Sequence, residues 1–128
     1  MDLLQELESK LTENTKLEQA LSAFHEICLI PNEDDGKMFY FNAQQYSGDS
    51  FAVDIVYQYH NNDTDEFMQL VMEICYKQIP GIASPDSDDI WCETPDKLIQ
   101  AFKASDTYNY ITDNNLQIQE IAVFLDET

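Results

Sequence analysis

The fold is decided by residues 37–60, KMFYFNAQQYSGDSFAVDIVYQYH, in which apolar side chains return at every second position. The turn sequence at 47–50 separates two alternating runs, whose apolar members are Phe39, Phe41, Ala43, Phe51, Val53, Ile55, Tyr57 and Tyr59. Such alternation is typical of strands with one buried face, and a short Gly-containing turn joins neighbouring antiparallel strands. We therefore predict a β-hairpin over 38–60, with one strongly apolar face that a helix must cover.

The segment that follows the hairpin is predicted to be that covering helix, over 64–79. Asp63 can cap its first turn. Gln69, Glu73 and Lys77 recur at intervals of four, which on a helix places them in one narrow polar stripe. The remaining side chains are mostly apolar, so this pattern predicts a largely buried helix.

The rest of the chain predicts helices and one further strand. Leucines recur at helical spacing before residue 30, which indicates amino-terminal helices. Residues 82–93 contain proline and four acids without a sustained period, which predicts a surface loop. Thr94-Pro95 then begins a helix over 95–104. Residues 116–125 fit a strand or a helix, and we favour a third strand.

The length and composition indicate one α+β domain over residues 1–128. A chain of 128 residues is close to the commonest domain size and leaves too little polypeptide for two cores. Hydrophobic residues make up 44% of it, with seven Phe, seven Tyr and one Trp, so its acidity does not predict disorder. We expect an antiparallel hairpin or small sheet packed against helices.

The charge is strongly one-sided. Six lysines face twenty-five acidic residues, there is no arginine, and the net charge is −19. Such a field repels nucleic acid and anionic membranes, and without a guanidinium the chain has no bidentate grip on phosphate. The same field speeds encounter with a positively charged molecule. The composition therefore favours a basic protein as the partner.

Catalytic side chains are scarce, and we expect no enzyme. The histidines are His25 and His60, and His25 and Cys28 lie one helical turn apart, a spacing that can begin a zinc site. Nothing in the sequence completes that site. A calcium loop starting at Asp86 would place Trp91 where glycine is required. We predict no cofactor and no dedicated metal site, and only weak cation binding by the acidic runs stays open.

The sequence also predicts the compartment. The amino terminus has no basic region followed by an apolar run, and no window approaches the roughly 18 apolar residues of a membrane span. Three widely spaced cysteines, Cys28, Cys75 and Cys92, suit reduced thiols better than a disulfide scaffold. We expect a cytoplasmic protein.

The candidate binding residues are the acids of two predicted loops and the single tryptophan. They are Glu33, Asp34, Asp35, Asp86, Asp88, Asp89, Trp91 and Glu93. An aromatic side chain ringed by acids is typical of a binding anchor surrounded by steering charges. The alternatives are that the acids only confer solubility and that Trp91 folds inward. Outward-facing Tyr40, Tyr46, Asp54 and Gln58 of the hairpin form a second candidate surface.

In its size, its charge of −19 and its acidic runs Glu33-Asp-Asp35 and Asp86-Ser-Asp-Asp89, the chain resembles the immunity proteins that bacteria keep against their own secreted toxins, including those of contact-dependent inhibition systems. The resemblance implies an antitoxin role. The partner would be a toxin domain, often a cationic nuclease, whose active site an acidic surface occludes.

Two other functions stay open. A nucleic-acid mimic would use its carboxylates in place of phosphates to inhibit a DNA- or RNA-binding protein. That role favours acids along an extended helical face, whereas the densest runs here lie in predicted loops. A chaperone or adaptor would use the amphipathic amino-terminal helices.

Overall fold

The computed structural model describes residues 2–31, 35–46 and 48–127, and within these ranges the chain forms four helices and five strands. The helices are α1 (Leu3–Lys10), α2 (Leu17–Cys28), α3 (Pro95–Lys103) and α4 (Asp106–Asp113). The strands are β1 (Asp35–Gln45), β2 (Ser50–Asn61), β3 (Glu66–Lys77), β4 (Ser87–Cys92) and β5 (Ile118–Glu127). The predicted α+β class is confirmed.

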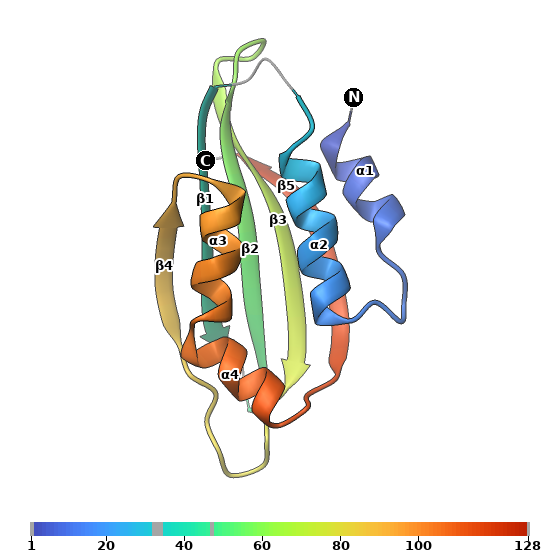
Figure 1. Cartoon of the computed structure of the whole chain (residues 1–128), viewed down its shortest axis with the longest axis vertical. Coiled ribbons are helices and arrows are strands. Elements are labelled where there is room, and N and C mark those ends of the chain that lie inside the picture. Colours follow the sequence, from blue (N-terminus) through green and yellow to red (C-terminus); the bar gives the residue numbers. More distant parts are fainter. Residues whose placement is uncertain (1, 32–34, 47, 128) are drawn as a thin grey trace.

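The strands form one antiparallel sheet in the order β4-β1-β2-β3-β5. The four helices lie on one face of this sheet (Figure 1). Helix α3 packs on β1 and β4, and α1 packs against β5 at the opposite edge. The other face carries no helix from the described part of the chain.

The predicted hairpin is confirmed as β1 and β2, and it supplies the centre of the main core. Its register pairs Phe39 with Tyr57 and Phe41 with Ile55, so the apolar positions of both strands share the helical face. Phe41 is fully buried, and its ring meets that of Phe102 from α3 at a centroid distance of 5.3 Å. Burial of these rings joins the two layers.

The prediction of a helix over 64–79 is wrong, because this segment is β3. Gln69, Glu73 and Lys77 recur every four residues, and an interval of four also keeps side chains on one face of a strand. Met72 and Ile74 are fully buried toward the helices, whereas Glu73 between them is half-buried on the other face. Because β3 carries apolar residues on both of its faces, its sequence resembles that of a buried helix.

The prediction of a loop over 82–93 is also wrong in part, because Ser87–Cys92 forms the edge strand β4. It pairs with β1 through the backbone, and the Ser87 hydroxyl accepts a hydrogen bond from the Ala43 amide at 3.0 Å. Acidic side chains are common on edge strands, where they oppose pairing with another chain. A strand held mainly by backbone hydrogen bonds does not need alternating apolar and polar side chains, so its sequence shows little periodicity.

The other predicted elements agree with the structure. The amino-terminal helices and a carboxy-terminal strand, β5, are confirmed. Helix α3 begins at Pro95, and the Thr94 hydroxyl caps it by accepting a hydrogen bond from the Lys97 amide at 3.1 Å.

Truncation of two neighbouring side chains of β3 tests the strand. We expect Ile74→Ala to lower the free energy of unfolding by about 2–5 kcal/mol, because it leaves a cavity in the main core. Cys75→Ala should cost less than about 1 kcal/mol, because Cys75 lies half-buried on the other face. Urea unfolding measures both values. Similar large losses would instead fit a buried helix.

Candidate binding surface on the uncovered face of the sheet

An apolar row crosses all five strands on the face without helices. The strand registers place its five members next to one another in the order Trp91, Tyr40, Val56, Val71 and Phe124. Tyr40, Val56 and Val71 form a small core of their own, separate from the main core, and Phe124 packs against it. Tyr40, Val56 and Val71 are buried and Phe124 is partly buried, so the side chains of this row pack against one another.

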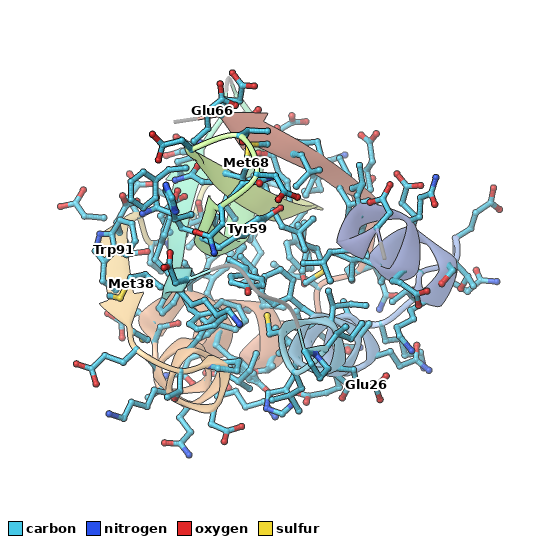
Figure 2. The ribbon with its side chains drawn as sticks, turned by 90° about the horizontal axis from the view of Figure 1, so that it is seen from above. Glu26, Met38, Tyr59, Glu66, Met68 and Trp91 are labelled. Carbon is cyan, nitrogen blue, oxygen red and sulfur yellow. The ribbon has the colours of Figure 1, made fainter. Side chains whose placement is uncertain are left out.

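Trp91 is the exposed end of the apolar row. Its ring lies on Tyr40 with a centroid distance of 4.4 Å, which leaves Tyr40 buried, while 46% of Trp91 is accessible to solvent. Figure 2 shows Trp91 at β4, away from the helix that carries Glu26. The alternative that Trp91 folds into the main core is therefore wrong.

A row of acidic and amide side chains runs beside the apolar row, and we call Asp89, Asn42, Asp54 and Glu73 the acidic row. Asn42, Asp54 and Glu73 are direct partners across β1, β2 and β3. The Asn42 side-chain amide donates to Asp89 Oδ1 at 2.8 Å, which ties β4 into the row. On the other side of the apolar row, Asp126 of β5 pairs with Gln69 of β3.

The carboxyl groups of Asp54 and Glu73 share a hydrogen bond. Burial, which is the largest cause, the hydrogen bond with Glu73 and the negative charges of Glu73, Asp89 and Asp126 together raise the pKa of Asp54 to about 7. Two carboxylates cannot form a hydrogen bond without a proton between them. The pair therefore holds one proton up to about neutral pH.

The lysines of the chain do not balance these acids. The ion pairs of lysine among the described residues involve the helical layer or the start of α3: Lys10 with Glu26 at 3.0 Å, Lys103 with Glu18 at 2.9 Å, and Lys97 with Glu93 at 3.6 Å. The charges that act on Asp54 all come from acidic residues. Lys77 lies on this face at the end of β3, opposite Ser50, and the centre of the face around Asp54 retains its negative field.

The residues predicted from the acidic runs are separated by the structure. Asp89 and Trp91 lie on the uncovered face. Asp86 accepts a hydrogen bond from the Gln45 amide at 3.1 Å, Asp88 is exposed on β4, and Glu93 pairs with Lys97. Asp35 lies 3.3 Å from His60 Nδ1 near one end of the sheet, and Glu33 and Asp34 fall outside the described residues.

The second surface predicted from the sequence, by contrast, lies on the same face of the sheet as Trp91 and Asp89. Tyr40, Asp54 and Gln58 are on the uncovered face, and the Tyr46 side chain reaches Glu73 with a hydrogen bond. The sequence reading missed Glu73 and Val71, because it placed them on a helix, and also Phe124 and Asp126. The signal for Glu73 was the four-residue spacing, which a strand satisfies as well.

The histidines and cysteines do not form a site together. His25 of α2 pairs with Asp96 of α3, while His60 Nε2 lies 2.9 Å from Asp65. Cys28, Cys75 and Cys92 are free thiols, and burial raises the pKa of each. Within the described ranges, no group of three or more His, Cys, Asp or Glu side chains is placed to hold a metal ion.

Comparison with known proteins gives no further guide to the function. No protein-family model matches the chain, and neither the curated proteins nor the solved structures give a significant match. Among the described residues, no helix is both long and apolar enough to cross a membrane.

Replacement of Asp54 tests the shared proton. The folded state raises the pKa of Asp54, so its contribution to stability is present below the ordinary pKa of an aspartate and is lost as the pH rises through about 7. Asp54→Asn removes that loss. Allowing for solvent screening, we expect the variant to gain about 1–2 kcal/mol over wild type at about pH 8 and little at about pH 5.

Urea unfolding at both pH values measures this difference. Asp113→Asn on α4 is the control, because it makes the same chemical substitution at an exposed position outside the row. A gain that is the same in both variants, or one that does not depend on pH, would contradict the shared proton.

Proposed function

We propose that the protein binds a cationic protein through the uncovered face of its sheet and thereby neutralises it. The observation that carries this proposal is the apolar row with an exposed tryptophan at one end and acids on both sides. An aromatic anchor with a charged periphery is the usual layout of a protein-binding hot spot. The sign of the charge selects a basic partner.

The two parts of the surface contribute to different steps of binding. The net charge of −19 and the acids of this face accelerate association with a basic surface, and salt weakens that effect. The exposed Trp91 ring and the partly buried Phe124 ring lose water only when the partner is seated, so they slow dissociation. Fast association with slow dissociation suits an inhibitor that must capture its target before the target acts.

Within this class, we propose an immunity protein that occludes the active site of a nuclease-type toxin domain. A groove built to hold phosphate presents lysine and arginine side chains, and carboxylates can satisfy them. The acids here are arranged across the strands of a sheet. This layout fits the rim of a compact groove better than the long backbone track that a nucleic-acid mimic would imitate.

A capture experiment with charge-matched variants tests the surface. The immobilised protein is exposed to a lysate of its source cell that contains the product of the neighbouring gene, at low and high salt. We expect one basic protein to be retained at low salt. Asp89→Asn with Asp126→Asn should retain about tenfold less, because both charges flank the apolar row.

The control is Glu8→Gln with Asp113→Asn, which makes the same change in net charge at exposed helical positions. It should retain the partner as wild type does. Equal retention by the two double variants would contradict the proposed face. If the captured protein binds chromosomal DNA and is not toxic, nucleic-acid mimicry would replace the immunity role.

Neutralisation is then tested in cells that express the captured protein. We expect the wild-type protein and the control variant to restore growth, and the variant lacking Asp89 and Asp126 carboxylates to restore it poorly. Growth that none of the three proteins restores would contradict the inhibitor role, even with the binding intact.

A further inference from the structure

Two hydrogen-bond acceptors of the acidic row have no donor. Asn42 Oδ1 and Asp54 Oδ1 are shielded from solvent and have no hydrogen-bond partner, although their residues are direct partners across β1 and β2. The Asn42 amide nitrogen already donates to Asp89. Because a buried acceptor without a donor costs stability, the acidic row as a whole is short of donors, and a ligand that brings donors to its solvent-facing carboxylates is favoured.

The neighbouring groups restrict what that ligand can be. The local charge is negative, which requires a cation. The described residues offer no grouping that would hold a metal ion. A guanidinium is planar, carries five N–H donors, loses its hydration more readily than an ammonium and stacks on aromatic rings. Trp91 provides such a ring, exposed and on the same face of β4 as Asp89.

We propose that the acidic row is the seat of one arginine side chain of the partner, whose guanidinium lies against the exposed Trp91 ring and donates to the carboxylates of Asp54 and Asp89. Below about neutral pH, where Asp54 and Glu73 still share a proton, the arriving guanidinium displaces that proton to solvent. This inference rests on the proposed function, and it adds the side chain that is recognised and the proton that is exchanged.

The proton exchange makes the affinity depend on pH. The charged groups that act on Asp54 are Glu73 of β3, Asp89 of β4 and Asp126 of β5. Its other titratable neighbours are Tyr40, Tyr46 and Cys75, whose pKa values are raised chiefly by burial, so they remain neutral. With the pKa of Asp54 near 7, the arginine seat should bind more tightly as the pH rises and level off above about neutral pH.

The test uses two probes of equal charge, nona-arginine and nona-lysine. Trp91 is the only tryptophan of the chain, so its fluorescence reports binding at the proposed seat. At fixed salt and about pH 7.5, we expect nona-arginine to bind about tenfold more tightly than nona-lysine. Its affinity should rise about tenfold from pH 5.5 to 7.

Calorimetry in two buffers with different ionisation heats counts the protons. At about pH 6 we expect wild type to release about one proton on binding nona-arginine. Asp54→Asn should still bind through the remaining acids, and its proton release should be lower than that of wild type by about one. Asp113→Asn is the matched control and should behave as wild type does.

The outcomes separate this inference from the proposed function. Equal affinity for both peptides, or the same proton release in wild type and Asp54→Asn, would overturn the arginine seat. If Asp89→Asn with Asp126→Asn still weakened binding, the proposed surface would stand without the seat. If that double variant bound like wild type and Trp91 fluorescence never changed, the surface and the seat would both be overturned.

Discussion

The alternation of side chains along β2 and β3 is the constraint on which the rest of the structure depends. Once Val53 and Ile55 face the helices, Asp54 between them must face the other way. The described helices all cover one side of the sheet, so that other face remains a surface. Each apolar position that builds the main core therefore also fixes one position of the candidate binding surface.

One point of the uncovered face opposes stability, and we propose that binding uses the same point. Asp54 and Glu73 are direct cross-strand partners, and once both are charged, above about neutral pH, their repulsion destabilises the sheet. A neutral pair would remove this repulsion without any change to the fold. Natural chains retain destabilising groups mainly where a function uses them. The exposed Trp91 ring at the same face is a second departure from what folding alone requires.

The sequence predicts the parts of this molecule that depend on local pattern. The hairpin, the amino-terminal helices and the start of α3 at Thr94-Pro95 each have a period or a cap that is legible in a few residues. The segment of β3 has no such local signal, because polar residues at an interval of four fit a helix and a strand equally. The edge strand β4 is held by its pairing with β1, which no pattern within β4 records.

The candidate surface is predictable only in pieces. Trp91 and Asp89 stand out by their type, and Tyr40 and Asp54 stand out as the outward positions of a hairpin. Their meeting depends on the β1–β4 register, and the contribution of Phe124 depends on the pairing of β5 with β3. These are long-range pairings, so their physical cause lies in the packing of the whole chain.

The most direct test of the binding surface is to map the amide and indole chemical shifts of the isotope-labelled protein during titration with nona-arginine. We expect the largest changes at the Trp91 indole and along the apolar and acidic rows of the uncovered face. Changes confined to α1, α2, α3 and α4 would place the cationic ligand on the opposite face and contradict the proposed surface.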